Sequence, residues 1–314
     1  MEKPNIAIIG AGMSGMICAR NLKDAGYEPI VFEKSRGVGG RMATRRTSEG
    51  LQFDHGAQYV TAKNKYFQSF IDRLASAGYA AHWEVDGKNT FVGSPSMNSM
   101  LGSVAKDISL KLNQEIKTVD KVENGWALFS ENQKQLFDIV VLALPAPQII
   151  NLIGRNNSLS RKICDIVMAP CLTLMAAFTP DQATPFITRR EVNDDLAWIA
   201  QDSAKPQRSR EITCWVAQAG DDWSRRYLEC DKDEITRILT PMLCERLGIS
   251  ASGLLYSSAH RWRYSKVIVP LGRPYISDDS ATLYLGGDWA TGARVEAAWE
   301  SGTAIASDIL KLVE

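Results

Sequence analysis

The sequence predicts an α/β fold of two domains, in which a second, mixed-sheet domain is inserted between separate segments of the first. Three observations support this prediction. The chain opens on a β-α-β pattern, and residues 138–144 form a continuous apolar run that is typical of a strand buried on both faces. A short strand and a long helical segment close the chain. The length of 314 residues suits about two domains of ~150 residues each.

Short-range signals define the N-terminal elements. Residues 5–9 are a short apolar strand bounded by Gly10, and a helical pattern then runs to Ala25, with Gly26 as its stop signal. Residues 29–33 form a second strand. A signal peptide could resemble this start, but a buried strand and its following helix explain the glycine positions better.

The next elements show two different periods. Residues 51–54 predict a strand and residues 66–77 a helix with one apolar face. From residue 108 the pattern has period two as far as the continuous apolar run at 138–144, and Asn124-Gly125 predicts a hairpin. The C-terminal part predicts a strand at 282–285, a turn at 286–288 and a helix at 295–312.

Residues 151–255 mix strand-like and helical segments. Within them, the charged stretch 205–210 is expected to be a solvated loop, and a contact with a substrate phosphate is the alternative. We expect the following domain boundaries: the first domain at 1–60, 99–155 and 256–314, and the second domain at 61–98 and 156–255.

Composition excludes several classes of protein. Lys+Arg and Asp+Glu both number 36, and a formal charge of zero argues against a nucleic-acid binder. Six cysteines without a C-x-x-C pair argue against a disulfide scaffold or a zinc knuckle, and the three histidines are too widely separated to suggest a metal site. No run of 18 apolar residues is present, so no membrane span is expected and the cytoplasm is the expected location.

A dinucleotide motif lies between the first strand and the first helix. Residues 10–15 fit G-x-G-x-x-G, and Glu33 follows eighteen positions past Gly15, at the end of the next strand. Gly10 allows the tight turn, Gly12 lets backbone amides approach a pyrophosphate, and Gly15 lets helix and strand pack closely. The helix N-terminus favours phosphate, and Glu33 can accept hydrogen bonds from both adenosine ribose hydroxyls. Because its carboxylate would repel a 2′-phosphate, this nucleotide is not NADP.

Two further motifs favour FAD over NAD. Residues 34–41 form a second glycine-rich loop that ends in Arg41, which we expect near the pyrophosphate. Near the C-terminus, Leu285-Gly286-Gly287-Asp288 precedes a helix. Asp288 would then bind a ribityl hydroxyl, and the amides near residues 294–296 would face the flavin N1/C2=O edge, where reduced flavin carries negative charge.

The order GAGMSG, GVGGR, FDHGAQY, DIVVLALPAP and GGDWATGARVEAAW resembles the glutathione-reductase-type FAD fold of amine oxidases and their relatives. Within that group the chain is similar to the renalase family, through FDHGAQYVTA, VGSPSMNSML, LPAPQ, AHRWRYS and GDWATGARVEAAWESG. Ala297 stands where this family is expected to have glycine. The motifs together predict non-covalently bound FAD and the following cofactor-binding residues: Gly10, Gly12, Met13, Ser14, Gly15, Glu33, Lys34, Gly40, Arg41, Gly56, Ala57, Gln58, Tyr59, Asp288, Arg294 and Val295.

The resemblance implies oxidation of misreduced nicotinamide dinucleotides, with the hydride at ring position 2 or 6, to NAD(P)⁺. Reduced FAD would then pass electrons to molecular oxygen, giving hydrogen peroxide, and the role would be metabolite repair. Hydride transfer leaves an aromatic ring and no proton to remove, so positioning is the main contribution of the protein and no catalytic residue is assigned. The candidates for the substrate slot are Tyr59, Met97, Trp198 and His260; for each, ordinary packing is the competing interpretation.

Three other functions stay open at this point. A flavin amine oxidase acting on a small amine would need aromatic walls over the flavin, and Trp289 could supply one. A carotenoid- or porphyrinogen-type desaturase would usually have a larger, more apolar substrate domain. A non-catalytic flavin-binding protein would not be bleached by any electron donor.

Overall fold

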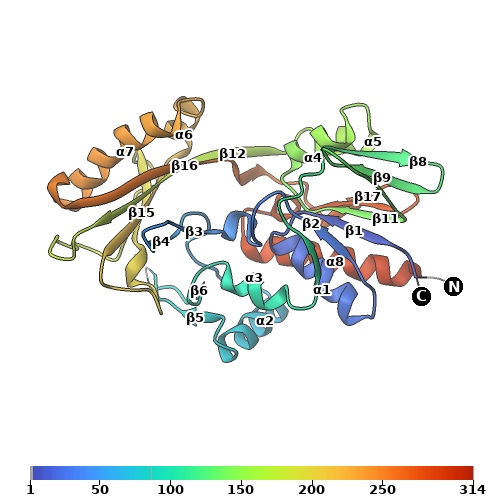
Figure 1. The fold of residues 1–314 in the computed structure, drawn as a ribbon, viewed down its shortest axis with the longest axis horizontal. Helices are drawn as coiled ribbons and strands as arrows, with labels where there is room; N and C mark the ends of the chain where they lie inside the picture. Colours follow the sequence, from blue (N-terminus) through green and yellow to red (C-terminus); the bar gives the residue numbers. More distant parts are fainter. Residues whose placement is uncertain (1–2, 86, 314) are drawn as a thin grey trace.

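The computed structural model describes residues 3–85 and 87–313, so the first two residues and the last residue of the expected first domain lie outside the described residues. A six-stranded sheet forms the centre of the first region, on the right in Figure 1, in the order β17-β18-β11-β1-β2-β7. Its strands are β1 (Ile6–Ile9), β2 (Ile30–Phe32), β7 (Ser109–Lys111), β11 (Ile139–Leu142), β17 (Tyr275–Ser277) and β18 (Leu283–Gly286). All neighbours are parallel except β17 and β18.

Helices and a small antiparallel sheet cover the two faces of this sheet. Alternate residues of β1 and β11 point to opposite faces, so each strand contributes to two separate hydrophobic cores. Ile6, Ile8 and Val141 pack against helices on one face, whereas Ala7 and Ile9 belong to the core of the other face. The first face carries α1 (Met13–Asp24), α2 (Lys65–Ser76), α3 (Ser99–Val104) and α8 (Val295–Val313). The second carries α4 (Ala146–Ile153), α5 (Ser158–Ile163) and the antiparallel sheet of β8 (Thr118–Val122), β9 (Gly125–Phe129) and β10 (Lys134–Phe137).

A five-stranded sheet forms the second region, on the left in Figure 1, in the order β13-β14-β15-β12-β16. Its strands are β12 (Val167–Phe178), β13 (Thr188–Arg190), β14 (Leu196–Gln201), β15 (Thr213–Ala219) and β16 (Leu254–Val269). Helices α6 (Asp221–Arg226) and α7 (Lys232–Leu247) pack on its outer face. All of its strand pairs are antiparallel, so the mixed pairing of the molecule lies in the six-stranded sheet.

The long strands β12 and β16 run from one region to the other across the upper side of the molecule (Figure 1). The domain boundary expected at residues 255 and 256 falls inside β16, which pairs with β12 over most of its length. Two small antiparallel hairpins are also present: β3 (Thr44–Arg46) with β4 (Gln52–Asp54), and β5 (Ala80–His82) with β6 (Phe91–Gly93). The short 3-10 turns are η1 (Gly40–Met42), η2 (Asp202–Ala204), η3 (Ala251–Gly253) and η4 (Asp288–Ala290).

The sequence-predicted strands and helices of the first region lie within a few residues of the observed ones. The Asn124-Gly125 hairpin joins β8 to β9, and the closing helix is α8. None of the helices in the described residues is both long and apolar enough to cross a bilayer.

Two helices from opposite ends of the chain, α1 and α8, pack directly against each other. A Cβ at Gly302 of α8 would stand 2.2 Å from the backbone oxygen of Ser14, in the first turn of α1. The absence of a side chain at Gly302 therefore sets the distance between these helices, and it does so beside the dinucleotide motif.

Gly302→Ala should thus destabilise the protein by about 1–3 kcal/mol, because either helix must move to accept the methyl group. Differential scanning fluorimetry would show this as a lower melting temperature, at roughly 2–4 °C per kcal/mol. Gly102→Ala is the matched control, since a Cβ at this exposed position of α3 meets no other atom within 4 Å. Equal melting temperatures for the two variants would contradict the packing argument.

Candidate functional site

One large cavity of about 2500 Å³ lies between the two regions. Typical sites for a single small ligand occupy ~300–1,000 Å³, so this cavity can hold a large cofactor together with a second molecule. Its walls come from the dinucleotide motif, the segment 32–48, the segment 55–61, the inner face of the five-stranded sheet and the N-terminal end of α8.

The turn between β1 and α1 has the geometry of a phosphate site. Gly10 has φ +107°, and a Cβ at Gly15 would stand 2.0 Å from the backbone oxygen of Gly10, so both positions require glycine. Gly12 lines the cavity and a Cβ there would meet open space. In the described residues the buried hydroxyl of Ser14 has no hydrogen-bond partner, although it also lines the cavity. A free hydroxyl beside the first-turn amides of a 12-residue helix suits a phosphate.

Glu33 lies at the end of β2, with its side chain almost fully buried. Its Oε2 accepts a hydrogen bond from the Ala11 amide at 3.0 Å, and its Oε1 accepts one from the Ser35 amide at 2.8 Å. These contacts fix the carboxylate on the cavity wall. Each carboxylate oxygen keeps acceptor capacity for a ribose hydroxyl.

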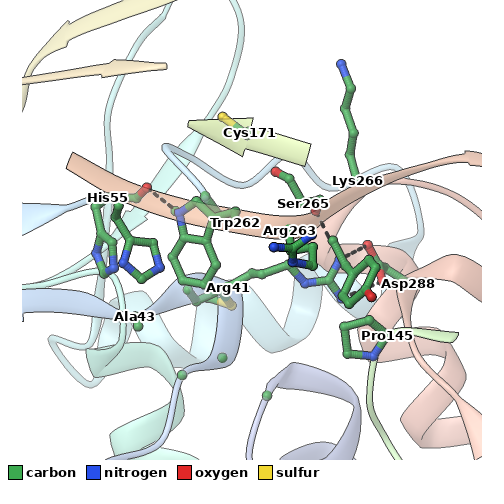
Figure 2. A pocket seen from close by; sticks show the side chains of 18 of the residues that line it. Arg41, Ala43, His55, Pro145, Cys171, Trp262, Arg263, Ser265, Lys266 and Asp288 are labelled. Atoms are coloured by element: carbon green, nitrogen blue, oxygen red, sulfur yellow. Dashed lines mark hydrogen bonds and ion pairs between the residues drawn. The ribbon is translucent and has the colours of Figure 1, made fainter. Parts of the chain in front are cut away.

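Arg41 and Asp288 form a two-point ion pair on the cavity wall. Nη1 of Arg41 lies 2.8 Å and Nη2 lies 2.6 Å from the two carboxylate oxygens of Asp288 (Figure 2). Nη1 also donates to the backbone oxygen of Ser265 in β16 at 3.1 Å. The sequence predicted both side chains as cofactor ligands and did not predict that they pair with each other.

Hydrogen bonds from both regions hold the segment 55–59. The Ala57 amide donates to the backbone oxygen of Arg41 at 2.8 Å, and a Cβ at Gly56 would stand 2.0 Å from that same oxygen. From the five-stranded sheet, Nε2 of Gln218 donates to the backbone oxygen of Gly56 at 2.7 Å, and Nε1 of Trp262 donates to that of His55 at 2.9 Å (Figure 2). No sequence motif surrounds Gln218, so this contact was not predicted, and Trp262 was given no role within the AHRWRYS motif.

An imidazole pair lies beside this segment. The rings of His55 and His260 meet edge to face with centroids 4.7 Å apart, and the Trp262 ring lies 5.0 Å from the first and 4.3 Å from the second. Burial, His260 and the Arg45 charge together lower the pKa of His55 to about 3. Burial and the Arg45 and Lys232 charges lower the pKa of His260 to about 4. Both imidazoles are therefore neutral at pH 7.

The structure brings together three of the four residues predicted for the substrate slot. Tyr59, Trp198 and His260 all line the cavity, and the Tyr59 and Trp198 rings are 5.7 Å apart. Met97 does not line it: this side chain is fully buried in the core, and its sulfur lies 3.4 Å from the Gly93 amide. Met97 is therefore a packing residue, held in place by the turn that follows β6.

The charged stretch 205–210 is not simply the solvated loop that its composition predicts. Lys205 is fully buried, with Nζ 2.6 Å from Asp202 and 3.5 Å from Asp54, and Arg208 pairs with Asp54 at 2.6 Å. Burial by itself would raise the pKa of Asp54, but the Lys205 and Arg208 charges lower it to about 2. Nζ of Lys205 also lies 3.3 Å from Oε1 of Gln58. These four ionic residues, the buried ionic cluster, join the second region to the segment 55–59.

The C-terminal motif reaches the same cavity. Asp288 of η4, Arg294 and Val295, the first residue of α8, line it, as do most of the other predicted cofactor residues. Gly15 packs behind the phosphate turn, as the helix–strand argument requires. Ala297, found in place of the expected glycine, is fully buried in α8. Arg294 is ion-paired with Glu296, whose Oε1 accepts hydrogen bonds from the amides at 63 and 64, each at 2.6 Å.

Comparisons with known proteins identify the family to which this chain belongs. Residues 8–74 match the family model of the NAD(P)-binding Rossmann-like domain, and residues 66–310 match that of the flavin containing amine oxidoreductases. The chain belongs to the flavin-containing amine oxidoreductase family. FAD is therefore its expected cofactor, and the open phosphate turn, the free Ser14 hydroxyl and Glu33 fit it.

Among curated proteins, renalase of Mus musculus is 27% identical over 170 residues, which cover 48% of this chain and 49% of that protein. L-amino acid oxidase Lm29 of Lachesis muta is 28% identical over 129 residues, which cover 41% of this chain and 24% of that protein. The matches thus span about half of the first relative and about a quarter of the second.

Two solved structures share the whole fold. A putative protoporphyrinogen oxidase from Exiguobacterium sp. 255-15 has a TM-score of 0.77 at 11% identity and covers 98% of this chain and 99% of its own. Cyclohexylamine oxidase from Brevibacterium oxydans has a TM-score of 0.71 at 13% identity and covers 99% of each chain. At these identities the likeness concerns the fold alone.

Replacing Glu33 with Arg should lower FAD affinity at least ~10-fold, because two charged acceptors are lost and a cation enters the ribose site. FAD retained per chain after gel filtration measures this, with Glu33→Gln as a milder control that keeps one acceptor. Flavin content equal to that of the wild type in Glu33→Arg would refute the ribose assignment.

Lys205→Met should destabilise the protein by about 3–5 kcal/mol, because it leaves buried carboxylates without their cation. Adding Asp202→Asn removes one of those charges, so the double variant should be more stable than the single one. Urea denaturation of all three proteins tests this. A single variant as stable as the wild type would show that the buried ionic cluster does not hold the two regions together.

Proposed function

We propose that this protein is an FAD-dependent oxidase of misreduced nicotinamide dinucleotides, the 2- and 6-dihydro isomers of NAD(P). The reaction would be dihydro-NAD(P) + O₂ + H⁺ → NAD(P)⁺ + H₂O₂. Its role would be metabolite repair in the cytoplasm. The observation that carries this proposal is the charge of the cavity wall.

The whole chain carries no formal net charge, yet the cavity wall carries 14 lysines and arginines against 7 aspartates and glutamates. Such a surplus favours anionic ligands, because like-signed groups in a cleft reinforce one another's field. FAD accounts for one anionic ligand. The remaining volume and positive charge suit a second nucleotide better than a protonated amine, which the same field would repel.

The groups near the predicted flavin face also suit hydride transfer. Bound FAD would supply a hydride acceptor at N5 of its ring. His55 is buried and His260 is half-buried, both are neutral at pH 7, and the loss of hydride from a dihydropyridine requires no base. The contribution of the chain is then orientation: Tyr59 and Trp198 form apolar walls, and the segment 55–59 is fixed by Gln218 and Trp262.

The partial match to a renalase supports this substrate class, and the family name supports the alternative, oxidation of a small amine. Cyclohexylamine oxidase from Brevibacterium oxydans, whose name indicates an amine substrate, has the same fold as this chain. The two functions differ in the charge of the substrate. The cationic cavity wall is the observation that favours the dinucleotide.

Anaerobic stopped-flow absorbance tests the proposal, one electron donor at a time. We expect 2- or 6-dihydro-NAD(P) to bleach the flavin at least ~10²-fold faster than ordinary NADH, because a displacement of about 1 Å from N5 costs that much. A panel of monoamines is the control. Fast bleaching by a monoamine, without response to any dihydronicotinamide isomer, would replace this function by amine oxidation.

A further inference from the structure

The inner face of the five-stranded sheet carries one row of residues that are direct register partners across all five strands. Arg190 pairs with Trp198, Trp198 with Gln218, Gln218 with Thr173, and Thr173 with His260. Directly paired residues point to the same face of a sheet. All except Thr173, which is fully buried, line the cavity. This cross-strand row therefore forms a roof over the cavity.

The middle of the cross-strand row lies against the predicted flavin-binding segment, because Gln218 donates to the backbone oxygen of Gly56. The next member, Trp198, is only 8% exposed and lies against Tyr59. In the described residues its buried indole N–H has no hydrogen-bond partner. The pocket beside Trp198 can thus hold a flat ring that carries a hydrogen-bond acceptor.

Arg190 ends the cross-strand row on the edge strand β13, one strand beyond Trp198 and two beyond Gln218. At ~4.8 Å between strands, its backbone lies about 10 Å from that of Gln218. Its side chain is exposed and lines the cavity, and no hydrogen bond or ion pair joins it to another described residue.

Most acidic side chains in the β13–β14 hairpin already form ion pairs with other arginines. Glu191 pairs with Arg189 at 3.4 Å, and Asp194 pairs with Arg246 at 3.0 Å. Asp195 adds one carboxylate to this wall of the cavity, and Arg226 adds a second guanidinium. The positive charge of Arg190 is therefore available to a ligand.

We infer that Arg190 binds the phosphate nearest the nicotinamide ring when that ring lies against Trp198. This inference rests on the proposed function. In a nicotinamide nucleotide one ribose separates the ring from its first phosphate, so a ring beneath Trp198 directs this phosphate along the cross-strand row toward the edge strand. A guanidinium is well suited to receive it, since it can form two parallel charged hydrogen bonds.

The test is Arg190→Gln, compared with wild type on three oxidised ligands: nicotinamide riboside, nicotinamide mononucleotide and NAD⁺. Their binding to the holoenzyme is followed by perturbation of the flavin absorbance spectrum, which requires no turnover. The reduced 6-dihydro forms of the same three compounds are then used in anaerobic stopped-flow reduction. Arg237→Gln is the matched control, because Arg237 is an exposed arginine of α7 that does not line the cavity.

We expect Arg190→Gln to weaken mononucleotide and NAD⁺ binding ~10-fold and to leave riboside binding within about twofold. FAD content and the limiting rate of flavin reduction should not change, and Arg237→Gln should resemble wild type throughout. Equal weakening for the riboside, no weakening for the mononucleotide, or weakening for NAD⁺ alone would each overturn the inference.

If the proposed function is wrong, the same experiments would give a different set of results. In that case wild-type flavin would not be bleached by any reduced ligand, whereas the binding titrations would still compare phosphorylated and unphosphorylated ligands. A tenfold loss confined to the phosphorylated pair would then support an anion site at Arg190 in an enzyme with a different donor. Absence of phosphate-dependent binding to wild type would overturn the site itself.

Discussion

The placement of the segment 55–59 between two sheets is the constraint on which the rest of the site depends. Hydrogen bonds from Gln218 and Trp262 hold its backbone from the five-stranded sheet, and Arg41 holds it from the side of the first region. Behind the segment, the buried ionic cluster fixes Asp54 and Gln58 to the second region. Because buried charges are costly unless paired, this arrangement exists only when both regions are docked. The cavity is thus formed by the docking.

The charge distribution follows from the same docking. Although the chain has no formal net charge, twice as many cationic as anionic side chains line the cavity. Some of these cations are already paired, Arg41 with Asp288 and Lys266 with Asp221 at 2.8 Å, and these hold the walls in position. Others, such as Arg190, are unpaired among the described residues and lie on the wall formed by the second region. The cavity wall therefore holds both ion-paired cations and cations that are unpaired among the described residues.

Local chemistry explains what the sequence could predict. The dinucleotide turn, Glu33 and the start of α8 are motifs whose spacing is set by one strand, one turn and one helix, so their positions follow from short-range rules. Met97 was wrongly predicted to line the substrate slot, because a sequence motif does not show which of its side chains point into the hydrophobic core. Lys205 and Arg208 seemed solvated because their partner Asp54 lies about 150 residues away in the sequence. The cross-strand row depends on the register of five strands, and a single sequence does not specify that register.

The measurement that tests the central claim most directly is a crystal structure of the FAD-loaded protein with NAD⁺ bound. The proposed function predicts a nicotinamide ring between the flavin and the Tyr59–Trp198 walls, with ring carbon 2 or 6 closest to flavin N5. Density for NAD⁺ outside the cavity between the two regions, or a ring with carbon 4 against N5, would contradict the claim that this cavity is built for misreduced dinucleotides.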